Sequence, residues 1–118
     1  MSDPLDDLMT QVRSFRDTRD WKKFHTIRNL IVSVSIEAGE MLELTQWKSE
    51  EELANLASDT QEREALEQEA ADIFIYLLLI ADGAGFNLLD AAHRKLALNE
   101  DRYPAEKSRG KATKYTDL

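Results

Sequence analysis

The stretch Ile73-Phe74-Ile75-Tyr76-Leu77-Leu78-Leu79-Ile80 is apolar on every side of the helix in which we expect it to lie. That helix begins near Thr60 with a charged first half, and it ends near Asp82 because Gly83 and Gly85 follow. A helix that is apolar all round must be covered all round, and a chain of 118 residues has few other helices to do so. The stretch therefore predicts a helical fold whose subunits share this surface in a homo-oligomer.

The rest of the chain also indicates helices, and no segment has the pattern of a strand. Asp3 before Pro4 is typical of a helix start, and Ser49 with Glu52 matches a capping box. Apolar residues repeat at i, i+3, i+4 and i+7 after Thr26. We expect helices over residues 4–18, 26–47, 49–57, 60–82 and 87–102, with an irregular connection over 19–26. The sequence thus predicts one all-α domain over residues 1–118, with four to five helices per protomer and a basic tail over 104–118.

Composition excludes several classes of protein. The absence of cysteine excludes disulfide scaffolds, thiolate metal sites and cysteine nucleophiles. The longest apolar run, Ile73 to Ala81, is far shorter than the roughly 20 residues that span a membrane. No signal sequence opens the chain, so we expect a cytoplasmic location. The net charge of −8 gives no general attraction for a nucleic-acid polymer.

The charge is unevenly distributed along the chain. Residues 50–72 hold nine acidic residues and one basic residue, whereas residues 104–118 hold four basic and two acidic residues. The acidic stretch has the chemistry to bind a metal ion and the basic tail has the chemistry to bind phosphate. The alternative is a solvated helix face followed by an ordinary frayed terminus, and charge alone does not decide between the two.

Two pairs of carboxylates lie at helical spacing beside apolar faces. Glu37 and Glu40 are three residues apart in the second expected helix, and Glu69 and Asp72 have the same spacing in the fourth. Tyr76 follows one turn after Asp72 on the same face. If the two helices pack antiparallel, four acidic groups converge and repel each other unless a cation binds. The spacing therefore indicates a site for a hard divalent cation such as Mg²⁺, which prefers carboxylate oxygens and bridges to phosphates.

These acids allow two other interpretations. Acidic pairs at this spacing also occur by chance on any solvated helix. A di-iron helical bundle expects Glu-x-x-His on two of its helices, and the chain has no such motif. Its nearest equivalent is a single Asp90-x-x-His93, so the di-iron interpretation fails.

Glu37-Ala38-Gly39-Glu40, a gap of 28 residues and Glu69-Ala70-Ala71-Asp72 resemble the ExxE…ExxD signature of the all-α, MazG-like nucleoside triphosphate pyrophosphohydrolases. The flanking sequence is similar to the dCTP pyrophosphatase branch of that family. The matching blocks are Arg19-Asp20-Trp21, Phe24-His25, Arg28-Asn29-Leu30, Glu43-Leu44, Gln46-Trp47-Lys48, Ile75-Tyr76-Leu77, Asn99, Arg102-Tyr103-Pro104 and Lys114-Tyr115-Thr116. The resemblance extends from about Arg16 to Leu118.

The resemblance implies an enzyme that cleaves a deoxynucleoside triphosphate, dCTP or a modified dCTP, into the monophosphate and pyrophosphate. Glu37, Glu40, Glu69 and Asp72 would be its catalytic metal ligands, for Mg²⁺ or alternatively Mn²⁺. The active site would lie between helices of an oligomer, with a tetramer built from dimers expected ahead of a simple dimer. Such an enzyme removes unwanted nucleotides from the cellular pool.

The resemblance also implies which residues bind the substrate. Around the base and sugar these are Trp21, His25, Trp47 and Tyr76. Lys95, Asn99 and Arg102 would face the nucleotide, and Arg109 and Lys114 of the tail would close over the β- and γ-phosphates. From the sequence alone, each of these has an alternative role in packing or on a solvated face. Two further alternatives stay open: the same chemistry with dUTP, dATP or a broad range of triphosphates, and a non-enzymatic helical oligomerisation module.

Overall fold

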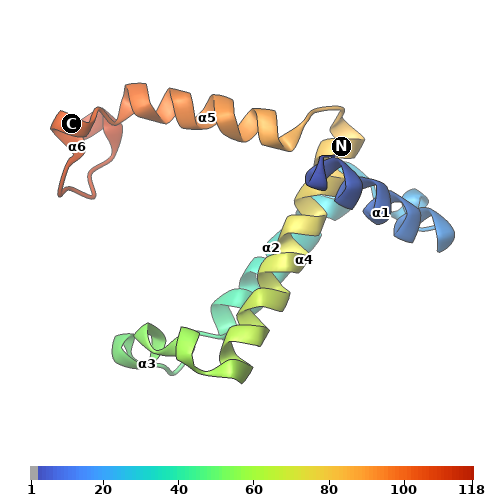
Figure 1. The fold of residues 1–118 in the computed structure, drawn as a ribbon, viewed down its shortest axis with the longest axis horizontal. Coiled ribbons are helices and arrows are strands. Elements are labelled where there is room, and N and C mark those ends of the chain that lie inside the picture. Colours follow the sequence, from blue (N-terminus) through green and yellow to red (C-terminus); the bar gives the residue numbers. More distant parts are fainter. Residues whose placement is uncertain (1–2) are drawn as a thin grey trace. The chain divides into compact units, whose positions relative to one another are not determined.

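The computed structural model describes residues 3–118, and every regular element in this range is a helix (Figure 1). The α-helices are α1 (Pro4–Thr18), α2 (Ile27–Glu43), α3 (Glu50–Ala54), α4 (Thr60–Ala84), α5 (Leu88–Arg102) and α6 (Ala105–Ser108). Single turns of 3-10 helix lie at Lys22–Phe24, Leu56–Ser58 and Tyr115–Asp117. The predicted all-α class is confirmed.

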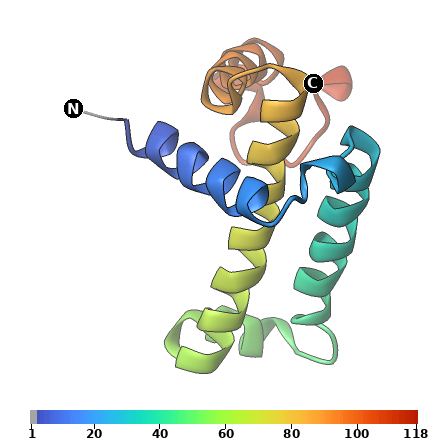
Figure 2. The same cartoon turned by 90° about the vertical axis from the view of Figure 1, so that its right-hand side faces the viewer.

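The chain divides after Gly85 into two units. In the first unit, α2 and α4 run side by side in opposite directions, and α1 crosses α4 (Figures 1 and 2). The second unit contains α5, α6 and the tail. The antiparallel arrangement of α2 and α4 is the one that brings the predicted carboxylate pairs together. The expectation of a single domain stays a prediction.

The core of the first unit is small. Val12 of α1, Leu30 of α2 and Leu79 of α4 pack together as its buried centre. In the apolar stretch 73–80, only Leu78 and Leu79 are buried, and Phe74 keeps 40% of its surface exposed. The stretch is therefore incompletely covered within one chain, as the sequence predicts. The homo-oligomer itself stays a prediction.

The end of α2 differs from the prediction. The helix stops at Glu43 rather than at Trp47. Beyond it, the backbone N–H groups of Thr45 and Gln46 bond three residues back, to Leu42 and Glu43, and the Thr45 hydroxyl donates to the Leu42 carbonyl at 2.7 Å. These bonds replace the α-helical pattern with tight turns, and Trp47 then adopts the left-handed conformation at φ 67°.

The end of α4 also differs in detail. The helix continues through Gly83 and ends at Ala84, with Gly85 in the left-handed conformation that commonly terminates a helix. Gly83 has another role, since a β-carbon there would lie 3.1 Å from Cδ1 of Ile27. Its missing side chain allows α2 and α4 to approach closely.

The other segments follow the prediction with small changes. The capping box of Ser49 and Glu52 is present, but α3 ends at Ala54 instead of Ala57. The connection over 19–26 contains a turn of 3-10 helix, and the tail contains the short α6 that the sequence did not indicate. No single helix among the described residues is long and apolar enough to cross a membrane, although α4 and α5 pass that test when counted together.

Candidate functional site

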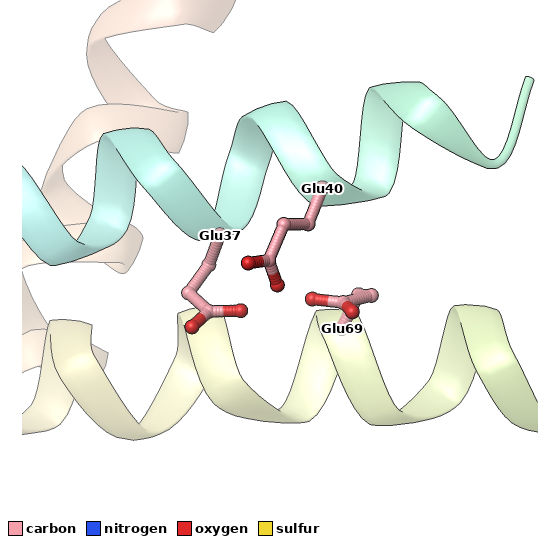
Figure 3. A group of neighbouring side chains, drawn as sticks. All are labelled: Glu37, Glu40 and Glu69. Atoms are coloured by element: carbon pink, nitrogen blue, oxygen red, sulfur yellow. The ribbon is translucent and has the colours of Figure 1, made fainter. Parts of the chain in front are cut away.

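Three carboxylates converge between α2 and α4. Glu37 and Glu40 of α2 extend toward Glu69 of α4 (Figure 3). One carboxylate oxygen from each residue lies within 4.8 Å of the others. Glu37 and Glu69 are half-buried and Glu40 is exposed, so one side of the cluster is open to a ligand.

The cluster is electrostatically unfavourable without a cation. The Oε2 atoms of Glu37 and Glu69 are both buried and have no hydrogen-bond partner in the protein. The nearby Glu69 carboxylate, followed by burial, raises the pKa of Glu37 above its ordinary value. Glu37 in turn raises the pKa of Glu40. Hard divalent cations bind carboxylate oxygens, so this set of donors fits an ion such as Mg²⁺.

Asp72, the fourth predicted metal ligand, lies outside this group of three. It follows Glu69 by one turn of α4, and it lines a cavity of about 420 Å³ between α1 and α4. The structure thus brings Glu37, Glu40 and Glu69 together. Asp72 lies one turn further along α4, at the edge of the cavity.

Aromatic side chains form much of this cavity. Phe15 and Trp21 meet edge to face with ring centroids 5.7 Å apart, and Trp21 meets His25 at 6.4 Å. Tyr76 lines the cavity from α4, four residues beyond Asp72. Of the predicted base-binding residues, Trp21, His25 and Tyr76 therefore lie around one cavity. Flat aromatic surfaces of this kind bind nucleobases by stacking.

His25 presents a polar atom that the protein leaves unsatisfied. Its Nδ1 is buried and has no hydrogen-bond partner. Burial, with a smaller contribution from the charge of Arg16, lowers the pKa of His25 below its ordinary value. The lowered pKa favours the neutral imidazole, and His25 lines the cavity beside Trp21.

Trp47 is placed differently from Trp21. It is 91% exposed, it follows the turns after α2, and it does not line the cavity of its own chain. Trp47 thus does not join Trp21 at this cavity within one chain, and its role in binding stays a prediction.

The remaining predicted substrate ligands belong to the second unit. Lys95 and Asn99 lie on α5, Arg109 follows α6, and Lys114 precedes the last 3-10 turn. The guanidinium of Arg102 lies over the ring of Tyr115 at 4.6 Å, and that ring meets Tyr103 edge to face at 5.9 Å. This aromatic group holds the end of the tail against the end of α5. Binding of phosphate by these residues stays a prediction.

Sequence reasoning missed the part that α1 plays in the cavity. Leu8, Val12, Phe15 and Arg16 all line it, and none was a predicted site residue. Leu8, Val12 and Phe15 share one face of α1 at spacings of four and three residues. That pattern indicates a buried face, but it does not indicate what the face encloses.

Comparisons with known proteins identify the family of the chain. The MazG-like family matches residues 32–118. The chain is 42% identical to dCTP pyrophosphatase 1 of Mus musculus and 38% identical to that of Homo sapiens, in each case over 97% of this chain and 67% of the relative. Among solved structures, a pyrophosphatase from Archaeoglobus fulgidus DSM 4304 superposes with a TM-score of 0.81 at 40% identity, covering 88% of this chain and 95% of that one. The predicted resemblance is confirmed: the chain belongs to the MazG-like family.

Proposed function

We propose that this pyrophosphohydrolase of the MazG-like family hydrolyses dCTP, or a modified dCTP, to the monophosphate and pyrophosphate with the help of Mg²⁺. The observation that carries the proposal is the junction at Asp72, where a carboxylate cluster adjoins an aromatic cavity. The similarity to dCTP pyrophosphatases of mammals supports the choice of base.

The carboxylate cluster and the aromatic cavity both include residues from one face of α4. Glu69, Asp72, Tyr76 and Leu79 are spaced by three, four and three residues, so they share a face of the helix. Ten residues of helix extend about 15 Å. A nucleotide bound along this face would have its phosphates at Glu69 and its sugar beside Tyr76.

Glu37, Glu40 and Glu69 would hold the metal ion, with Asp72 close enough along α4 to complete the set or to bind a metal-bound water. When bound, Mg²⁺ supplies charge neutralisation for the triphosphate and activates a water for attack at phosphorus. The protein's part is to hold the carboxylates in place: antiparallel packing of α2 and α4 fixes them before the ligand arrives.

The cavity would bind the nucleoside. Trp21 and Phe15 offer ring surface for the base, and the neutral His25 offers a hydrogen bond from Nδ1. Tyr76 lies between this aromatic end and Asp72, where the sugar would be placed. A ring at that point leaves little room for a 2′-hydroxyl, which would favour deoxyribose.

The second unit offers further candidate ligands for the substrate, and a second copy of the chain would cover the exposed apolar surface. Lys95, Arg109 and Lys114 carry positive charge suited to the β- and γ-phosphates. A homo-oligomer, with a tetramer expected ahead of a dimer, would cover the apolar stretch 73–80 and offer the exposed Trp47 to a neighbouring cavity.

The test is a panel of nucleoside triphosphates incubated with Mg²⁺, following release of pyrophosphate. We expect dCTP and its modified forms to be cleaved with the highest kcat/KM, and dUTP, dATP and CTP more slowly. Asp72→Asn should abolish cleavage and leave the helical content intact. Release of orthophosphate rather than pyrophosphate, or equal cleavage of CTP and dCTP, would contradict the proposal.

A further inference from the structure

Arg16 is a buried charge in the wall of the cavity. It is 6% exposed, and with Val12 it is one of the two buried residues of α1. Its Nη1 donates to Asp82 of α4 at 3.1 Å, and its Nε donates to Asp17 at 2.8 Å. Asp82 also accepts a bond from Nε of Arg13 at 2.9 Å. Arg16 thus anchors α1 to α4 beside the cavity that they enclose.

The main chain of Arg16 is joined to the aromatic wall. Its carbonyl oxygen accepts the N–H of Trp21 at 3.1 Å, beyond the end of α1. The preceding residue, Phe15, is the ring that meets Trp21 edge to face. Arg16 therefore connects Asp82 on α4 to the rings of Phe15 and Trp21, which both line the cavity.

Fold stability does not by itself account for this arginine. Removing a guanidinium from water is costly, and an apolar residue of similar size in such a place is often equally or more stabilising. A buried arginine with fixed partners holds the neighbouring chain in a defined position, because its planar guanidinium forms hydrogen bonds only in a narrow range of orientations. Arg16 therefore holds the wall of the cavity in position.

We propose that Arg16 is a positioning residue for the nucleobase: its bond to Asp82 holds Phe15 and Trp21 in place in the wall of the cavity that Tyr76 also lines. The inference rests on the proposed function, because it takes the cavity to be the base site. Arg16 acts through the two rings and makes no contact with the reacting phosphate.

The chain offers a matched control in Arg13. Both arginines lie on α1 and both bond to Asp82, but Arg13 is exposed and does not line the cavity. Arg16→Met leaves Asp82 paired with Arg13, and Arg13→Met leaves it paired with Arg16. Neither change therefore leaves Asp82 without a partner. Arg16→Met also removes the partner of Asp17, whose side chain is exposed and stays solvated.

The kinetic test compares the two variants on dCTP with Mg²⁺. Arg16→Met should raise KM about tenfold with kcat within about twofold, because a displaced wall weakens binding of a base that is remote from the reacting bond. Arg13→Met should change KM by less than about twofold. Equal KM changes in the two variants would overturn the inference. Absence of triphosphate cleavage by the unmodified chain would instead overturn the proposed function.

A second measurement needs no activity and follows Trp21 itself. The substitution Trp47→Phe leaves Trp21 as the single tryptophan. In that background, Arg16→Met should increase quenching of the Trp21 emission by acrylamide, and Arg13→Met should not, with helical content by circular dichroism equal in both. A raised KM for Arg16→Met with unchanged quenching would overturn the positioning role, since it would mean that the guanidinium touches the substrate directly. Unfolding of Arg16→Met with Arg13→Met unaffected would overturn it too, because Arg16 would then serve the fold.

Discussion

The carboxylates of Glu37 on α2 and Glu69 on α4 each bury one oxygen, Oε2, that no group of the protein satisfies. Both belong to the cluster whose ligand oxygens lie within 4.8 Å of one another. Buried acceptors without donors and like charges at short range both destabilise a fold. The cluster therefore destabilises the chain unless a cation or a proton neutralises it.

Neutralising one member of the cluster should therefore stabilise the metal-free protein. Glu37→Gln should raise Tm in buffer containing a chelator, because it removes a repulsive charge and supplies an amide donor. It should also abolish the stabilisation that we expect Mg²⁺ to give the unmodified chain, which would reach about 2.7 kcal/mol of unfolding free energy at a hundred times Kd. Glu51→Gln on the exposed α3 is the control, since it changes net charge equally. Equal effects of the two substitutions would show that overall charge is responsible.

We expect Trp47 to contribute to substrate binding and to lower the stability of the folded chain. Its φ of 67° is the left-handed conformation, which costs a non-glycine residue about 1–2 kcal/mol. Trp47→Gly should accordingly melt at a higher temperature than Trp47→Ala, which keeps the strained backbone. Both should raise KM for dCTP about 10- to 100-fold if the indole stacks on the base. An unchanged KM in both variants would exclude Trp47 from the site.

Apolar spacing and capping residues were enough to predict most of the fold from the sequence. They located α1, α4 and α5 to within two residues, because caps such as Asp3 and Asn87 and a left-handed Gly85 leave local signatures. The end of α2 was not predictable in this way. The residues between Glu43 and Trp47 are compatible with a helix, and the turns there depend on hydrogen bonds that include the Thr45 side chain.

The candidate site, too, could be predicted only in part. The convergence of Glu37, Glu40 and Glu69 follows from i, i+3 spacing on two antiparallel helices, so it could be predicted. The cavity could not, because it depends on where α1 crosses α4. Arg16 and Asp82 are 66 residues apart in the chain, and no local pattern indicates that they meet.

The assembled protein should be larger than one chain. Light scattering at micromolar concentration should give a multiple of 13.5 kDa, because one protomer leaves much of its apolar surface uncovered. Phe74→Glu, in the apolar stretch of α4, should lower this mass. Gln61→Glu, exposed near the start of the same helix, should not. A mass of 13.5 kDa for the unmodified chain would exclude the oligomer.

Acidification should reveal the half-buried His25. Burial, aided by Arg16, lowers its pKa in the folded chain, so the unfolded chain takes up a proton first as pH falls. The contribution of His25 to stability is thus complete above its unfolded pKa of about 6.5 and is lost as pH falls from there toward the folded pKa. His25→Gln should remove that part of the slope of unfolding free energy against pH. His93→Gln, at an exposed position on α5, should leave the slope unchanged.

The bond between Arg16 and Asp82 has a consequence for divergence of this protein from its relatives. Loss of Asp82 alone would leave Nη1 of a buried guanidinium without its acceptor, whereas loss of Arg16 alone leaves Asp82 joined to the exposed Arg13. Replacement of Arg16 should therefore be tolerated before replacement of Asp82, but not the reverse. Lineages that keep arginine at position 16 should keep an acid at position 82, and lineages that lost the arginine should be free to replace the acid afterwards.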